Sequence, residues 1–136
     1  MYSPTDLYFD QPDTDQLLQA VAPLLVERKA DSAMTEIAET KKAVSPLLCP
    51  FFPGRWTNCR IVSLRPSGQI VAHRDQPIAG TRYHIPLQSN EGCWVFHSGV
   101  WRQLKVGQVY EMDPSEPHGA VNWGSSMRLH LMLDVE

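Results

Sequence analysis

The sequence has few cysteines, and their arrangement builds no recognisable site. Its 136 residues include three cysteines, Cys49, Cys59 and Cys93, which are widely spaced and form no C-x-x-C pair. Disulfide-held secreted domains and cysteine zinc sites both need a denser pattern. We therefore expect reduced thiols and a cytoplasmic location.

Long apolar runs and an excess of positive charge are also missing. No stretch approaches the roughly 20 apolar residues of a membrane span, and the start shows no signal-peptide pattern. Lys and Arg number 12 against 15 Asp and Glu, a net charge of −3, whereas a nucleic-acid-binding face requires positive charge. The G-x-G-x-x-G, P-loop, G-x-S-x-G and H-E-x-x-H motifs are absent, which argues against the usual dinucleotide, phosphate-binding, serine-hydrolase and zinc-protease classes.

The pattern of the chain changes near residue 50. Apolar residues at spacings of three and four over 17–25 predict a helix with one apolar stripe, with a kink or a break at Pro23. A second helix is expected over 32–42, and the Pro-rich segment 45–54 is expected to end helical structure. Residues 1–57 are thus expected to form a helical support for the rest of the chain.

Residues 58–136 have the pattern of short strands and turns. Eleven prolines and eight glycines favour such a structure over a helical bundle. Even spacing of short strands is typical of a sandwich or small barrel. We expect one domain over 1–136, with seven strands at 59–64, 69–74, 82–87, 93–97, 100–104, 108–112 and 127–135.

Three polar residues could form a metal site. His73 and Asp75 project to the same side of a strand end, because side chains at i and i+2 share a face. His118, expected in a loop, could return beside them on a neighbouring strand, and two histidines with one carboxylate leave one side of an iron open. Taken singly, each has a plainer interpretation as a surface ion pair or a loop histidine. His97 is expected at the surface or a strand end, and His130 in the core or as support for the site.

Two strands share the pattern Arg-x-His-aliphatic-x-Leu, at 82–87 and 128–133. In each strand the Arg and His share one face, and in the second strand leucines occupy the other. If the polar face is exposed, nothing needs explaining. If it lines a barrel, a buried guanidinium needs an anionic partner. Interior carboxylates look few, so a bound dicarboxylic acid reaching from a metal to an arginine would satisfy the requirement.

These motifs together resemble the aspartyl/asparaginyl β-hydroxylase-like family of Fe(II)/2-oxoglutarate-dependent oxygenases, over residues 59–136. The resemblance implies a mainly β fold, a double-stranded β-helix (a jelly-roll, cupin-like barrel) with the metal at its open mouth. The N-terminal helices would pack on one of its sheets. The joint spacing that carries the resemblance includes His73-x-Asp75, Arg82-x-His84, His118-Gly119-Ala120 and Arg128.

The family's site residues map onto positions of this sequence. The resemblance implies that His73, Asp75 and His118 bind Fe(II). It implies that Arg128 binds the distal carboxylate of 2-oxoglutarate. Around that co-substrate it places three further side chains, which correspond to His84, Arg82 (for co-substrate or prime substrate) and Ser63 (a hydroxyl donor).

The implied activity is hydroxylation of an unactivated C–H bond by dioxygen and 2-oxoglutarate, with release of succinate and CO2. An amino acid, free or peptidyl, is the implied substrate. Its contacts are expected from the loops 76–81, 90–93 and 123–127, with Trp123 the best aromatic candidate. Two alternatives stay open: a metal-dependent cupin enzyme that does not use 2-oxoglutarate, and a catalytically silent jelly-roll binding module.

Overall fold

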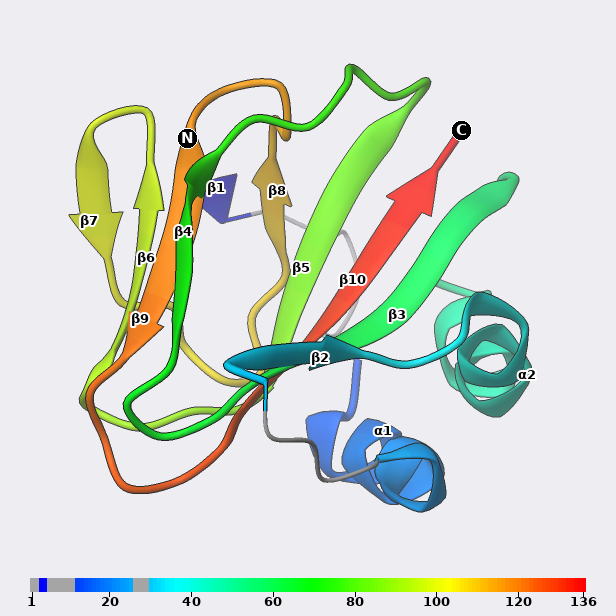
Figure 1. Ribbon diagram of the computed structural model, residues 1–136. Helices are drawn as coiled ribbons and strands as arrows, with labels where there is room; N and C mark the ends of the chain where they lie inside the picture. Colours follow the sequence, from blue (N-terminus) through cyan, green and yellow to red (C-terminus); the bar gives the residue numbers. More distant parts are fainter. Residues whose placement is uncertain (1–2, 5–11, 26–29) are drawn as a thin grey trace.

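The computed structural model describes residues 3–4, 12–25 and 30–136, and its strands form two facing antiparallel sheets (Figure 1). The larger sheet has the order β1-β8-β5-β10-β3-β2, and the smaller sheet has the order β4-β9-β6-β7. This arrangement confirms the predicted barrel. The strands are β1 (Ser3–Pro4), β2 (Ser32–Met34), β3 (Trp56–Leu64), β4 (Gln69–His73), β5 (Thr81–Gln88), β6 (Cys93–His97), β7 (Val100–Arg102), β8 (Tyr110–Met112), β9 (His118–Asn122) and β10 (Arg128–Val135).

The first helix, α1 (Thr14–Val21), begins and ends where the local chemistry requires. The Asp13 side chain caps it by accepting hydrogen bonds from two backbone N–H groups of the first turn. The predicted break at Pro23 is confirmed, since a short 3-10 turn over Ala22–Leu24 replaces the α-helix there. Neither described helix has the length and apolarity needed to cross a lipid bilayer.

The second helix differs from the prediction. Residues expected to start it form β2, which pairs with β3 instead. Helix α2 (Ile37–Leu48) then runs through Pro46, so the Pro-rich segment does not end it at 45. A proline inside a helix removes one backbone hydrogen bond. Here the buried side chains of Val44 and Leu48 keep the last turn in place, because packing of an apolar face supplies most helical stability.

Both helices cover the outer face of the larger sheet (Figure 1), as expected. Alternate residues of β10 point toward them, and these are the three leucines of the predicted apolar face. The side chains that meet in this core include Leu17, Val21, Val44, Leu48, Cys59, Ile61, Ile85, Leu129, Leu131 and Leu133. A smaller cluster lies elsewhere in the barrel and contains Leu64, Val95, Tyr110, Met112 and Ala120.

Three of the described strands were not predicted: the two-residue β1, β2 in place of the start of a helix, and β9. Residues 118–122 form β9, between β4 and β6, and not the predicted loop. The segment is short and contains Gly119, so it has little strand propensity of its own. Its backbone is held by pairing on both sides. The seven predicted strands are all present, with bounds within three residues of those expected.

Candidate metal centre

The structure brings the three predicted metal ligands together at one end of the barrel. His73 ends β4, His118 begins β9, and the two are opposite each other in the register. Asp75 follows two residues after His73, and its backbone N–H donates to the Pro114 carbonyl at 2.9 Å. One donor atom from each of the three side chains lies within 4.8 Å of the other two.

An irregularity in β4 helps to aim His73. The pairing of β4 with β9 shifts between Ile70 and His73, and such bulges re-aim side chains near functional sites. Gly119 lies against this irregular segment. A Cβ placed on Gly119 would lie 2.6 Å from the Ile70 carbonyl oxygen, so only glycine lets the two strands come this close.

Backbone carbonyls fix the tautomer of both histidines. His73 Nδ1 lies 2.7 Å from the Val71 oxygen, and His118 Nδ1 lies 2.8 Å from the Glu116 oxygen. A carbonyl can only accept, so each Nδ1 donates its proton and each Nε2 keeps a lone pair. The Nε2 atoms lie 3.5 Å (His73) and 3.7 Å (His118) from the carboxylate oxygens of Asp75. Burial lowers the pKa of His118, which favours the neutral, ligating form.

The loop 113–117 holds the site residues through its backbone carbonyls. Its carbonyl oxygens accept hydrogen bonds from the backbone of Asp75, from the His118 ring and from His97 Nε2, each at 2.8 or 2.9 Å. His97 does end a strand as predicted, but its side chain is buried. The expectation of a surface position was therefore wrong. The hydrogen bond of His97 connects β6 to the loop 113–117, which also binds the backbone of Asp75 and the ring of His118.

Arg82 connects Asp75 to a second, buried carboxylate. Its NH1 donates to Asp75 Oδ2 at 2.7 Å, while its Nε and NH2 donate to the two oxygens of Asp134 at 2.7 and 2.9 Å. Burial alone would lower the pKa of Arg82, but the two carboxylates raise it above its ordinary value. Sequence reasoning missed Asp134 as an interior anion. The signal was present, because Asp134 has the same even spacing as Arg128 along β10 and so shares its face.

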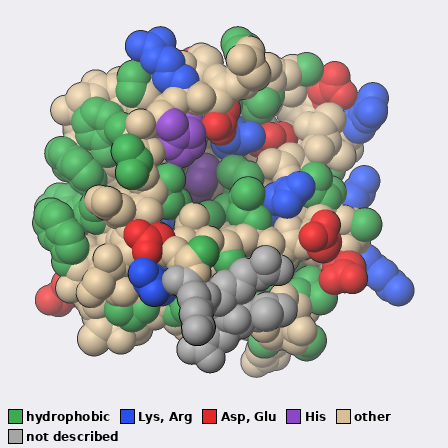
Figure 2. Space-filling view, in the orientation of Figure 1, with side chains coloured by type: hydrophobic (Ala, Val, Ile, Leu, Met, Phe, Trp, Pro, Cys, Tyr) green, Lys and Arg blue, Asp and Glu red, His purple; other side chains and the backbone are tan. Residues whose placement is uncertain are grey.

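A cavity of about 420 Å³ opens beside these residues. Figure 2 shows histidine side chains in a hollow of the surface, next to acidic and basic side chains. His84 and Arg128, both from the larger sheet, line the cavity as predicted and are almost fully buried. Burial, and then the positive charges of Arg128 and Arg82, hold the pKa of His84 well below its ordinary value. His130 is buried as well, with its ring edge-on to His84 at 5.8 Å.

Two predicted contacts are not brought to this cavity. Ser63 lies on the opposite face of the larger sheet, where it pairs with Leu129 and donates to the Ala33 carbonyl at 3.3 Å. Trp123 is 74% exposed and follows the far end of β9. At about 3.3 Å per strand residue, it is some 16 Å from His118. The loops 90–93 and 123–127 therefore lie at the wrong end of the barrel for contact with a substrate at the triad.

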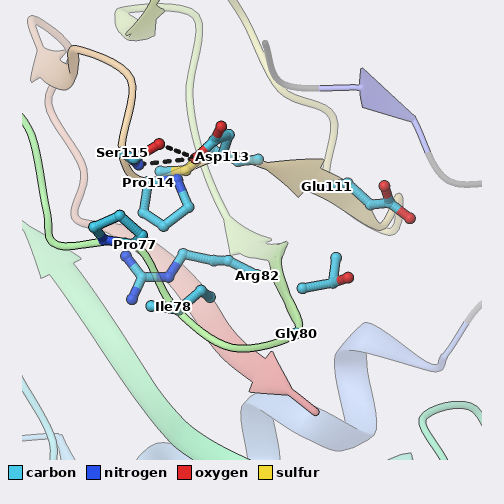
Figure 3. A pocket seen from close by; sticks show the side chains of 10 residues that line it. Pro77, Ile78, Gly80, Arg82, Glu111, Asp113, Pro114 and Ser115 are labelled. Carbon is cyan, nitrogen blue, oxygen red and sulfur yellow. Dashed lines mark hydrogen bonds between the residues drawn. The ribbon is translucent and has the colours of Figure 1, made fainter.

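The loop 76–81 does lie where it was expected. Together with residues 111–115 it lines a second cavity of about 500 Å³, shown in Figure 3. Arg82 and Met112 line both cavities, so the second borders the first. Pro77, Ile78 and Pro114 give it apolar walls near the Arg82 side chain (Figure 3).

A two-sheet barrel with two histidines and one carboxylate at its end defines the class: a double-stranded β-helix protein with a candidate 2-His-1-carboxylate centre. The chain belongs to the aspartyl/asparaginyl β-hydroxylase family, whose profile matches residues 11–136. The resemblance inferred from the motifs is thereby confirmed.

Individual relatives agree with the family and the fold. The chain is 33% identical to L-proline cis-4-hydroxylase of Rhizobium meliloti (strain 1021) over 86 residues, which are 57% of this chain and 29% of that protein. A 2OG-Fe(II) oxygenase-family oxidoreductase from Burkholderia pseudomallei shares the fold with a TM-score of 0.66 and 15% identity, covering 89% of this chain and 76% of the other. A cupin domain from Bordetella pertussis Tohama I does so with a TM-score of 0.54 and 12% identity, covering 82% and 99%.

Proposed function

We propose that this chain is an Fe(II)- and 2-oxoglutarate-dependent oxygenase that hydroxylates an amino acid, free or within a peptide. The observation that carries the proposal is the convergence of His73, Asp75 and His118, with both imidazoles held in the tautomer that a metal requires. Membership of the family and the similarity to a proline hydroxylase support the reaction type and the substrate class.

The residues present fit an iron ion. His73 Nε2 lies 3.5 Å from Asp75 Oδ1, His118 Nε2 lies 3.7 Å from Asp75 Oδ2, and Arg82 holds that second oxygen at 2.7 Å. One ligand atom from each of the three side chains is thus within 4.8 Å of the others, close enough to share an ion. Two imidazoles and one carboxylate are the ligand set of non-haem Fe(II) oxygenases, which leaves further coordination positions open. Each ligand side chain is oriented by a second hydrogen bond, as metal ligands commonly are.

The cavity also fits a small dicarboxylate. Arg128 lies in its buried wall, where a planar guanidinium can bind a carboxylate with two parallel hydrogen bonds. Burial, and then the neighbouring arginines, hold the pKa of His84 well below its ordinary value, which favours the neutral imidazole. It can therefore lie beside the co-substrate as a neutral hydrogen-bonding group. The volume of about 420 Å³ is that of an ordinary small-molecule site.

Bound iron and 2-oxoglutarate would supply, with dioxygen, the oxidising power to replace a C–H bond by C–OH, with succinate and CO2 as co-products. The chain's own part is to hold these partners and the substrate in register and to limit access of water. The buried wall around Arg128 and His84 serves the second purpose. The cavity of Figure 3, which borders Arg82, gives the prime substrate a route to the triad.

An anaerobic titration of the metal-free protein with Fe(II) and then 2-oxoglutarate tests the proposal. We expect a visible charge-transfer band that saturates with 2-oxoglutarate and is lost in His73→Ala. Gln69→Ala, at an exposed position at the other end of the same strand, is the matched control and should keep the band. Iron binding without a band would point to a cupin enzyme that does not use 2-oxoglutarate. Folded protein that binds no iron would point to a silent binding module.

A further inference from the structure

Arg82 sits between two carboxylates, and this position decides what it can do. It makes three hydrogen bonds of 2.7 to 2.9 Å, two to Asp134 and one to Asp75. Asp134 is 3% exposed and uses both of its oxygens on Arg82. All three of these hydrogen bonds of Arg82 go to carboxylates of the protein, so its guanidinium is already paired before any substrate binds.

Asp75 is the one candidate ligand that lies outside a strand. It lies beyond the end of β4, and its side chain is 37% exposed. An exposed carboxylate samples several rotamers, and ordering it costs conformational entropy. Arg82, by contrast, is fixed within the larger sheet by a two-point contact with a neighbouring strand. The bond from Arg82 to Asp75 Oδ2 transfers that order to the carboxylate and leaves Oδ1 facing His73.

We propose that Arg82, itself fixed by Asp134, is a positioning residue that holds Asp75 for the metal, and that it does not bind the carboxylate of a substrate. The inference rests on the proposed function, because it assumes a metal at the triad. It replaces the expectation from the sequence that Arg82 contacts co-substrate or prime substrate. Partners that orient metal ligands commonly change metal affinity by about 10- to 100-fold when removed.

The affinity of the metal-free protein for Co(II), a spectroscopic substitute for Fe(II), measures this role without 2-oxoglutarate or turnover. Arg82→Met and Asp134→Asn should each weaken Co(II) binding by about 10- to 100-fold. Arg60→Met is the matched control: Arg60 also lines the cavity from the larger sheet, but its hydrogen bonds go to Asn58 and to a backbone carbonyl. We expect that variant to keep the wild-type Co(II) affinity.

A double-mutant cycle separates positioning from a general effect on the fold. In an Asp75→Ala background, Arg82→Met should weaken Co(II) binding no further, because its route to the metal is gone. An equal loss in both backgrounds would overturn the inference. If Arg82→Met fails to fold, Arg82→Lys keeps the charge but cannot bridge both carboxylates with a planar fork, and it should still weaken binding.

The result with wild-type protein distinguishes the two proposals. Tight Co(II) binding that Arg82→Met leaves unchanged would overturn the role of Arg82 and leave the oxygenase proposal standing. Wild-type protein that binds neither Co(II) nor Fe(II) would overturn both.

Discussion

The two faces of the larger sheet are built from the same strands, but one packs against the helices and the other lines the candidate site. In β10, Leu129, Leu131 and Leu133 face the helices and belong to a continuous apolar core. Their sequence neighbours Arg128 and Asp134 are buried on the opposite face, toward the cavity. Because alternate side chains of a strand point to opposite faces, stability and chemistry occupy adjacent residues. Substitutions one position apart should therefore have separable effects.

Burial favours the neutral form of titratable side chains on both faces of the larger sheet. On the helix side, desolvation raises the pKa of the Cys59 thiol to about 12. On the cavity side, burial is the largest cause of the lowered pKa of His84 and of His130. Each group is driven toward its neutral form. The charged groups that persist on the cavity side, such as Arg82, do so because an opposite charge lies within hydrogen-bonding distance.

The largest expected effect comes from removing a ligand on the cavity side. Asp75→Ala should lower Fe(II) affinity by more than about 100-fold, beyond the loss seen when only a supporting partner is removed, and should abolish coupled turnover. The thermal unfolding midpoint should change little, because the side chain is partly exposed. Calorimetric Fe(II) titration and a succinate-release assay check this. Iron affinity and turnover at wild-type levels would contradict the ligand assignment.

On the helix side the effect should appear in stability. Leu131 is completely buried, and Leu131→Ala should lower the free energy of unfolding by about 2–5 kcal/mol, through lost burial and the cavity left behind. Chemical denaturation monitored by circular dichroism measures this. The folded fraction should keep its Fe(II) affinity. A loss of Fe(II) affinity in correctly folded Leu131→Ala would show that packing on the helix side affects the metal site. The two faces would then not have separable effects.

Arg128 and Leu129 are adjacent in the chain but lie on opposite faces, so substitutions there compare the two faces directly. Arg128→Met should raise the 2-oxoglutarate concentration required by about 10- to 100-fold, as expected for a lost charge-assisted hydrogen-bonding partner, with Fe(II) still bound. Leu129→Ala should instead lower stability and leave the 2-oxoglutarate requirement unchanged. The charge-transfer titration gives both values. An unchanged requirement in Arg128→Met would place the distal carboxylate elsewhere.

The sequence predicted the positions of most candidate site residues better than the elements around them. His73, Asp75 and His118 come together because strand pairing returns β9 to β4, and alternation placed Arg82, His84 and Arg128 correctly on one face. Alternation also could have excluded Ser63, which is out of phase with the cavity-lining residues of β3. Strand β9 and helix α2 were missed or misplaced because pairing and packing, which are tertiary, outweigh weak local propensity. Alternation along β10 could also have placed Asp134 on the face of Arg128, but its pairing with Arg82, 52 residues away in the chain, is a tertiary contact that no local pattern shows.

The smallest expected effect lies at the end of β4 remote from His73. Asp31 binds the Arg65 side chain there at 2.7 Å and accepts from the Gln69 N–H at 3.1 Å, and these hydrogen bonds, that of Gln69 first, lower its pKa. A carboxylate with a lowered pKa in the folded state stabilises the fold above its unfolded pKa of about 3.9 and loses this contribution as the pH falls through the folded value. Asp31→Asn should therefore lower the thermal midpoint slightly at pH 7, with the difference from wild type shrinking below about pH 4. Fe(II) affinity should stay unchanged at neutral pH. A difference in midpoint that persists undiminished at low pH would show that the hydrogen bonds accepted by both oxygens of Asp31, and not its charge, stabilise this end of the barrel.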